Sequence, residues 1–272
     1  MKISIVTPCR NSEKTIRRTI ESVVKQNLDG FELEYVIVDG LSTDNTISII
    51  EEFASKYSFI KYISEKDASM TEALNKGMRM TTGDIVASIN ADDVYLPNAL
   101  SLVCKEYKKK NCDILMVNTY IVEDGGFVRS HNTPRKFSPI ICAFIECPFP
   151  ECSIFFKREC VEKLGFFNEK VKYTQDLELY IRQYNAGYIF RYADIDVSCF
   201  FISKVNYSST ISDEMRTEVT TYISNPLIYK YISGTVFSKL LKLIFRMRHY
   251  YFFKKFDYDE LLQEIYDKKE NK

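Results

Sequence analysis

The chain of 272 residues is long enough for one large α/β domain with a tail, and for a sizeable buried core. It carries 37 basic and 37 acidic side chains, so its formal charge is zero and no global field would draw it to nucleic acid. No apolar run approaches the roughly 20 residues that span a bilayer, and the first residues turn polar too soon for a signal peptide. These features predict a cytoplasmic protein, soluble or peripheral on the membrane, without a nucleic-acid partner.

The eight cysteines lie in segments with the pattern of strands and helices, and their spacings are not those of a disulfide framework. We therefore expect reduced thiols. Four cysteines come close together in the sequence, but they include no C-x-x-C pair and no nearby histidine, which argues against tetrahedral zinc. These four are Cys142, Cys147, Cys152 and Cys160.

Short apolar runs alternate with amphipathic segments up to about residue 118, as in the strand-helix-strand units that build a parallel sheet. Pro8 is expected to end the first strand, Asn11 or Ser12 to cap the helix after it, and Pro97 to lie in the first turn of a later helix. A helix is also expected at residues 69–80. The expected strands are 3–7, 35–38, 59–63, 84–89 and 114–117.

The second half of the chain is less regular. Gly125-Gly126 predicts a hairpin, and an apolar strand is expected at residues 153–156. A helix should begin near Asp176 and end at Gly187, before a strand at 188–192. From residue 212 onward the periodicity is mostly helical.

Two adjacent acids, Asp92 and Asp93, directly follow the predicted strand at 84–89. Ligands of open parallel sheets collect at the carboxyl ends of the strands. Neighbouring carboxylates repel each other unless a cation or hydrogen-bond donors compensate. A Mn²⁺ or Mg²⁺ ion shared with a substrate diphosphate would do so. The alternative is that the two acids cap the helix that begins near Pro97.

Several segments occur together in an order and spacing that resemble family 2 glycosyltransferases. In the first hundred residues they are Ile3-Ser-Ile-Val-Thr-Pro, Val36-Ile-Val-Asp39-Gly-Leu-Ser-Thr-Asp44, Ala73-Leu-Asn75-Lys-Gly77 and Asn90-Ala-Asp-Asp93. The similarity continues through Pro150-Glu-Cys-Ser-Ile-Phe-Phe-Lys-Arg158, Lys163-Leu-Gly-Phe-Phe-Asn168 and Asp176-Leu-Glu-Leu-Tyr-Ile-Arg182. The resemblance implies a GT-A fold over residues 1–210, with a nucleotide-sugar half (1–118) and an acceptor half (119–210). A helical C-terminal extension would follow over residues 211–272.

The resemblance also implies roles for individual residues. Asp93 would bind the metal, and Asp176 matches the general base of the family, although it could instead be the N-cap of its own helix. Arg10 could neutralise a donor phosphate, but a lone basic residue in a loop is more often solvated. The remaining positions implied in nucleotide-sugar binding are Thr7, Pro8, Asp39, Asp67, Asn75 and Asp92.

These roles predict a metal-dependent, inverting transfer of one sugar from a nucleotide-diphosphate sugar, with a UDP-sugar favoured, to a hydroxyl of a saccharide or lipid-linked saccharide. Such an enzyme would serve cell-surface polysaccharide or glycolipid synthesis. The Gln-x-x-Arg-Trp motif of processive polymer synthases cannot occur here, because the chain has no tryptophan. Two rival functions are a nucleotidyltransferase acting on sugar phosphates and a non-catalytic nucleotide-sugar-binding module. The first usually has a glycine-rich loop after its first strand, which this chain lacks.

The sequence departs from the family pattern at three places. Leu41 replaces a residue that is commonly small, and Gln175 precedes the predicted base where a second acid is frequent. Residues 206–209, Asn-Tyr-Ser-Ser, stand where the family often has Gly-Gly-x-Ser, so we assign no site there.

Residues 236–255 are basic and aromatic and have the periodicity of an amphipathic helix. Two alternatives stay open for this helix. It could pack on the domain or form a homodimer contact, or it could lie on an anionic membrane surface.

Overall fold

The computed structural model describes residues 1–123, 127–131, 137, 150–202, 218 and 256–257. The predictions for residues 206–209 and 236–255 lie outside the described residues, as does nearly all of the predicted C-terminal extension. The described strands are β1 (Lys2–Cys9), β2 (Glu32–Asp39), β3 (Ile60–Ser64), β4 (Ile85–Ser88), β5 (Val94–Tyr95), β6 (Ile114–Glu123), β7 (Phe127–His131), β8 (Ile154–Lys157), β9 (Phe190–Ile202) and β10 (Phe256–Asp257). The described helices are α1 (Ile16–Val24), α2 (Thr46–Lys56), α3 (Met70–Met80), α4 (Ala99–Lys109), the 3₁₀ turn η1 (Glu151–Ser153), α6 (Arg158–Glu162) and α7 (Gln175–Asn185).

One mixed sheet forms the centre of the molecule. Its strand order is β10-β7-β6-β8-β4-β1-β2-β3, with β9 pairing to both β5 and β6. Strands β4, β1, β2 and β3 are parallel, as the alternation of strands and helices predicts. β8 runs antiparallel between β4 and β6, and β7 pairs antiparallel with β6, which confirms the hairpin predicted at Gly125-Gly126.

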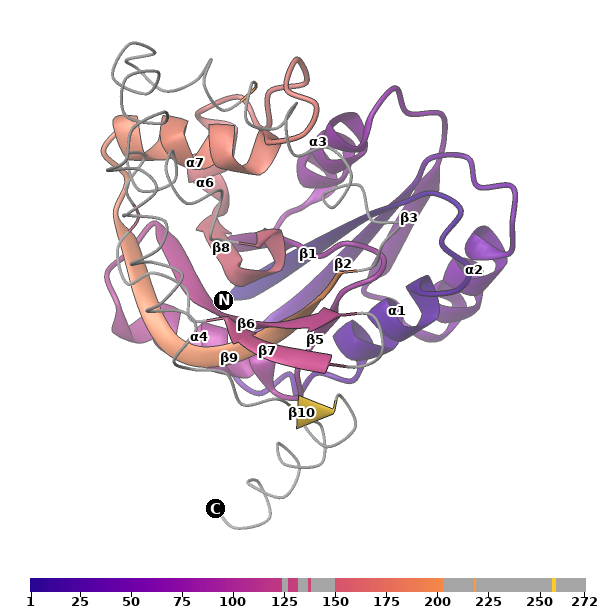
Figure 1. Cartoon of the computed structure of the whole chain (residues 1–272), viewed down its shortest axis with the longest axis horizontal. Coiled ribbons are helices and arrows are strands. Elements are labelled where there is room, and N and C mark those ends of the chain that lie inside the picture. The colour runs from indigo at the N-terminus through magenta and orange to yellow at the C-terminus, as the bar shows by residue number, and fades with distance from the viewer. Residues whose placement is uncertain (124–126, 132–136, 138–149, 203–217, 219–255, 258–272) are drawn as a thin grey trace.

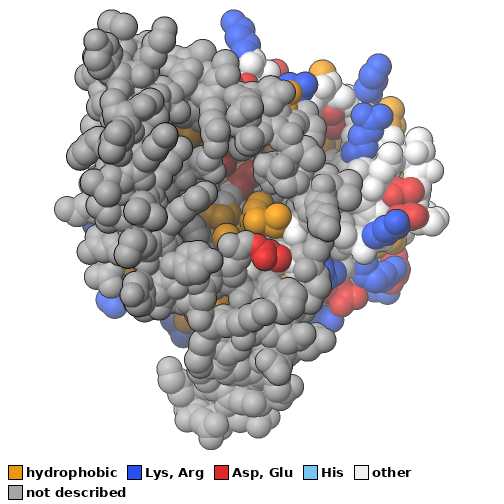
Figure 2. Space-filling view, in the orientation of Figure 1, with side chains coloured by type: hydrophobic (Ala, Val, Ile, Leu, Met, Phe, Trp, Pro, Cys, Tyr) orange, Lys and Arg blue, Asp and Glu red, His pale blue; other side chains and the backbone are white. Residues whose placement is uncertain are grey.

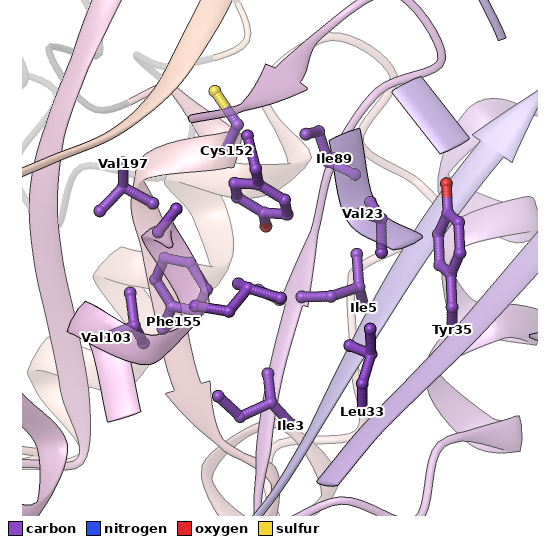
Figure 3. Close-up of a cluster of buried hydrophobic side chains, with 14 of the residues drawn as sticks. Ile3, Ile5, Val23, Leu33, Tyr35, Ile89, Val103, Cys152, Phe155 and Val197 are labelled. Atoms are coloured by element: carbon purple, nitrogen blue, oxygen red, sulfur yellow. The ribbon is translucent and has the colours of Figure 1, made fainter. Parts of the chain in front are cut away.

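Helices cover both faces of this sheet (Figure 1). Apolar residues of α1, α2 and α4 pack on one face, and those of α3, α6 and α7 pack on the other. Figure 3 shows part of the first core, where Ile3, Ile5 and Leu33 from the strands meet Val23 of α1 and Phe155 of β8. Both faces of β1 and β4 are buried, which explains why these two strands are largely apolar.

The first strand is longer than the sequence predicts, because Pro8 does not end it. Pro8 pairs in register with Val38, and the strand continues to Cys9, whose carbonyl accepts from Gly40 N–H at 2.9 Å. On the other side, the pairing of β1 with β4 stops at Val6. Along a strand, the backbone polar groups of successive residues point alternately to the two neighbouring strands. The backbone nitrogen of Pro8 therefore points to the β4 side, where the ladder has already ended. A proline costs no ladder hydrogen bond at that position.

Helix starts also differ in part from the predictions. α1 begins at Ile16, beyond Asn11 and Ser12, and α4 begins at Ala99 after Asn98, whose φ is +59°. The helix predicted at 69–80 is confirmed, with the Ser69 hydroxyl accepting from Glu72 N–H at 3.1 Å. Since α4 has its own N-cap at Asn98, the alternative that Asp92 and Asp93 cap this helix is wrong.

Two further observations concern the membrane and the thiols. No helix in the described ranges is both long and apolar enough to cross a bilayer. The six cysteines whose positions are described are all free thiols and buried, as expected from their spacing. These are Cys9, Cys104, Cys112, Cys152, Cys160 and Cys199.

Candidate functional site

The polar segments predicted to carry chemistry gather at one edge of the sheet. β1, β2 and β4 are parallel neighbours, so their carboxyl ends and the loops after them lie together. Because β8 is antiparallel to β4, the turn η1 that precedes β8 reaches the same edge. Figure 2 shows acidic side chains beside hydrophobic ones in the middle of one face of the molecule.

The loop after β2 is built around the buried carboxylate of Asp39. Its oxygens accept from Ser42 N–H at 3.1 Å, from Ser64 Oγ at 2.6 Å and from the Ser42 hydroxyl. These donors compensate the buried charge within the loop itself. Asp39 therefore shapes this end of the site, and its contact with a nucleotide base stays a prediction.

Asp67 lies next to this loop and has a polar atom without a partner. Its Oδ1 accepts from Lys76 Nζ of α3 at 2.5 Å, whereas its Oδ2 is buried and accepts no hydrogen bond in the described part of the chain. A Cβ placed on Gly40 would lie 3.3 Å from this Oδ2 and 3.5 Å from Cδ of Arg10, so the three residues are neighbours. Burial raises the pKa of Asp67 against the effect of Lys76. An acceptor oxygen at this position suits the N–H or hydroxyl groups of a nucleoside.

Thr7, Pro8 and Arg10, which were also predicted to bind the nucleotide-sugar, lie at the end of β1 and in the loop after it. Thr7 is buried, with its hydroxyl 3.0 Å from that of Tyr35, and Pro8 follows it on the opposite face of the strand. Arg10 is exposed, and its guanidinium forms no ion pair with the residues that the structure describes. Contacts of these residues with a donor remain predictions.

Asn75 is hydrogen-bonded to the segment that precedes α7. Its Nδ2 donates to Phe167 O at 2.9 Å and to Glu169 Oε1 at 2.8 Å, and its Oδ1 accepts from Phe167 N–H at 2.9 Å. Both polar atoms are thus engaged in fastening α3 to the segment before α7. Its contact with a donor stays a prediction.

The main chain of the Asp92–Asp93 turn is held by α1. Arg18 Nη2 donates to Asp92 O at 2.7 Å, and Thr19 Oγ1 donates to Asp93 O at 2.8 Å. The guanidinium of Arg18 also lies over the ring of Phe201, 3.7 Å from its centroid. Two side chains of α1 thus hold the backbone carbonyls of the turn.

The side chain of Asp93 is fully buried in an acidic environment. Its Oδ1 accepts from Phe201 N–H at 2.9 Å, and its Oδ2 lies 3.4 Å from Asn90 Nδ2. Burial and, after it, the charges of Asp92 and Glu151 raise the pKa of Asp93 well above its usual value. Desolvation and repulsion of this size indicate a group that a cation would stabilise.

The side-chain oxygen atoms around Asp93 suit a hard divalent cation that also binds a substrate. Asn90 Oδ1 is buried beside Asp93 and accepts no hydrogen bond among the described residues, and carboxylate and amide oxygens are the ligands that Mg²⁺ and Mn²⁺ prefer. No three His, Cys, Asp or Glu side chains in the described part converge into a complete metal cage. An ion here would therefore need further oxygen ligands, such as the phosphates of a substrate.

Asp176 lies in the first turn of α7. Thr174, not Asp176, is the N-cap, so the alternative that Asp176 caps its own helix is wrong. Its Oδ1 accepts from Leu177 N–H at 2.8 Å. Partial burial is the main cause that raises the pKa of Asp176 to about 6, and the charge of Glu218 contributes. A carboxylate with such a pKa can accept a proton near neutral pH.

Glu151 is a further acid of this site. It lies in the family-like segment 150–158, but the sequence predicted no role for it. It is 7% exposed, and its Oε1 accepts from the hydroxyl of Ser88 at the end of β4. Burial raises its pKa to about 7, and the charge of Asp176 contributes. Because Glu151 also raises the pKa of Asp93, it is close enough to both predicted functional acids to influence them. An acid directly before a predicted apolar strand was the signal that could have revealed it.

The burial of Glu151, which raises its pKa, predicts a pH-dependent effect of Glu151→Gln on stability. The pKa of Glu151 is about 7 in the fold against 4.5 as reference, so the wild type loses stability as pH rises through this window. Glutamine keeps an acceptor for Ser88 and removes the charge. We expect the variant to be more stable than wild type at pH 8, by up to about 3 kcal/mol, with the advantage vanishing below about pH 4.5.

Thermal or denaturant unfolding at pH 4.5 and pH 8 measures this difference. Glu162→Gln is the matched control, because Glu162 is an exposed acid on α6 that is paired with Arg158. A stability difference for Glu151→Gln that is equal at both pH values would contradict the prediction.

Comparison with known proteins identifies the family of the chain. The family model "Glycosyl transferase family 2" matches residues 4–167. Among curated relatives, the probable glycosyltransferase YdaM of Bacillus subtilis is 29% identical over 70% of this chain and 48% of its own length. The chondroitin synthase of Escherichia coli is 25% identical over 68% of this chain and 27% of its own length. The chain thus spans half or less of the length of these relatives.

Solved structures share the fold. TarS of Staphylococcus aureus, in complex with UDP, superposes with a TM-score of 0.64 at 19% identity, covering 86% of this chain and 70% of that one. The mannosyltransferase PcManGT from Pyrobaculum calidifontis, in complex with GDP-Man and Mn²⁺, gives a TM-score of 0.59 at 18% identity, covering 89% and 69%. The fold is therefore the GT-A fold that the sequence predicts, and the chain belongs to glycosyl transferase family 2.

Proposed function

We propose that the chain is a metal-dependent, inverting glycosyltransferase that moves one sugar from a nucleotide-diphosphate sugar, with a UDP-sugar favoured, to a hydroxyl acceptor. The observation that carries this proposal is that one site contains both a buried acid suited to bind a metal and an acid with a raised pKa suited to act as a base. Asp93 is buried next to Asp92 at the end of β4, and Asp176 begins α7 with a pKa raised to about 6. Glu151 interacts electrostatically with both of them.

On the donor side, Asp93 would hold the metal, and Asp92 would meet the ribose. The oxygen of Asp67 that has no partner in the described part would accept from the nucleoside, and Arg10 would lie near the phosphates. A divalent ion bound here supplies positive charge to the phosphate oxygens of the leaving nucleotide. The buried setting of Asp93 strengthens that interaction, because charges interact more strongly away from water.

On the acceptor side, Asp176 would take the proton of the attacking hydroxyl. Its raised pKa suits this step, since a base must bind the proton released during the attack. A single displacement assisted by one base inverts the anomeric centre. Retention through a covalent intermediate would need a second placed nucleophile, and neither the sequence nor the described part of the structure assigns one.

Known relatives support the substrate class. TarS has been solved with UDP and with UDP-GlcNAc, and PcManGT with GDP-Man and Mn²⁺. TarS is named a poly(ribitol-phosphate) β-N-acetylglucosaminyltransferase, and another relative is a chondroitin synthase. We therefore place the reaction in cell-surface polysaccharide or glycolipid synthesis. A cytoplasmic location, with residues 236–255 on the membrane or in a homodimer contact, is part of the same proposal.

A thermal-shift screen of the full chain tests this function. UDP, GDP, CDP and dTDP are each added with and without Mn²⁺, and stabilisation is expected from one of them only when the metal is present. Nucleotide release from the matching donor sugar then measures turnover. An equal response without metal would contradict the role of Asp93. Release of pyrophosphate from a nucleoside triphosphate and a sugar phosphate would instead indicate a nucleotidyltransferase.

A further inference from the structure

The carboxylate of Glu218 binds the segment that leads into α7. Its Oε1 accepts from Lys172 N–H at 2.7 Å. Its Oε2 accepts from Tyr173 N–H, Thr174 N–H and Thr174 Oγ1, each at 2.9 Å. One side chain thus receives three consecutive backbone N–H groups and a hydroxyl, from residues that lie 44 to 46 positions earlier in the chain.

These bonds hold the segment just before α7, because the N–H groups of Lys172, Tyr173 and Thr174 precede the first helical residue, Gln175. The first turn of a helix has N–H groups without helical partners, and an N-cap side chain usually satisfies one of them. Thr174 is the N-cap of α7, but its hydroxyl makes no capping bond and donates to Glu218 instead. Consecutive backbone N–H groups form a cradle for an anion, and a negative charge near a helix N-terminus is favourable. Here the anion comes from a remote part of the same chain.

Asp176 stands two residues beyond Thr174, so the position of this segment determines its position. In the described part of the chain, the acids that interact with it from other elements are Glu151 of η1 and Glu218. On its own helix, Glu178 is bound by Arg182 at 2.8 Å. The carboxylate that orders the start of α7 therefore also supplies negative charge next to Asp176.

We propose that Glu218 is a positioning residue that fixes the start of α7 and, through it, both the location and the basicity of Asp176. The catalytic meaning of this role rests on the proposed function, in which Asp176 is the base. The hydrogen bonds to Glu218 and their effect on Asp176 do not depend on which sugar or acceptor is used. They can be tested on the protein alone.

The test uses the full chain with Glu218→Ala, which removes all four bonds, and Glu218→Gln, which keeps one acceptor oxygen without the charge. Hydrogen bonds to a charged group are stronger than those between neutral groups. Hydrogen exchange of the amides of residues 172–174 should therefore be about tenfold faster or more in Glu218→Ala. In Glu218→Gln, the carboxyl of Asp176 should titrate at lower pH, as measured by carbon NMR with the signal assigned through Asp176→Asn. The acid limb of nucleotide release should move in the same direction.

Glu162→Gln is again the control and should change neither measurement. Unchanged exchange at residues 172–174 in Glu218→Ala would overturn the proposal. Faster exchange with an unchanged Asp176 titration in Glu218→Gln would also overturn it, because Glu218 would then be a structural tether only. A wild-type chain that releases no nucleotide from any donor refutes the proposed function, while the exchange and titration results still decide the role of Glu218.

Discussion

Asp176→Asn should lower the rate of nucleotide release by about 10²–10⁴-fold, the usual contribution of a general base. Asparagine has nearly the same size and can still accept from Leu177 N–H, so the start of α7 should stay in place. The wild-type rate should fall as pH drops below about 6, because the base becomes protonated, and the residual rate of the variant should lack this dependence.

Steady-state release of nucleotide from the donor between pH 5 and pH 8 measures both effects. Donor binding, followed by metal-dependent thermal stabilisation, should be equal in the variant and the wild type, because Asp176 acts on the acceptor hydroxyl. A variant that turns over at the wild-type rate would show that Asp176 is not the base. A variant that no longer binds donor would assign Asp176 to the donor side instead.

Asp93→Asn should have opposite effects on donor binding and on the stability of the metal-free protein. Without the carboxylate, the stabilisation by nucleotide and Mn²⁺ should disappear, a loss of about 2.7 kcal/mol at a hundredfold excess over the wild-type dissociation constant. Without metal, the variant should melt at a higher temperature than the wild type, because a fully buried charge next to Asp92 has been removed. Asparagine can still accept from Phe201 N–H.

Thermal melts of both proteins, with and without nucleotide and Mn²⁺, separate these effects. Glu162→Gln should keep the full response to ligand. If Asp93→Asn retained the metal-dependent stabilisation, the ion would have to bind elsewhere. If metal-free Asp93→Asn melted at a lower temperature than the metal-free wild type, the Asp93 carboxylate would stabilise the fold. It would then not be a metal ligand that the fold keeps although it lowers stability.

The features predicted well from the sequence are those that depend on local chemistry. The alternation of strands and helices predicted that β4, β1, β2 and β3 are parallel, and the helix expected at residues 69–80 is α3. The acids Asp92 and Asp93 lie at a strand end as predicted. Each of these depends on residues close together in the chain or on a repeated pattern.

The features that were missed depend on contacts between distant segments. Pro8 reads locally as a strand end, and only the early end of the β4 ladder explains why the strand continues. Glu151 reaches the site because β8 pairs with β4, and Glu218 binds residues more than 40 positions away. Asn75 matched a donor-site motif, but its amide binds the backbone of Phe167. No periodicity in the sequence encodes these pairings.

The place of β8 between β4 and β6 has a consequence for exchanging specificity among relatives. Residues after 118 supply an interior strand of the sheet, so the two halves of the chain share one core and are not separable modules. A chimaera that takes its acceptor half from a relative would import a central strand together with the new binding residues. Its success should depend on how well Ile154, Phe155 and Phe156 are matched by their new neighbours, before any question of sugar recognition arises.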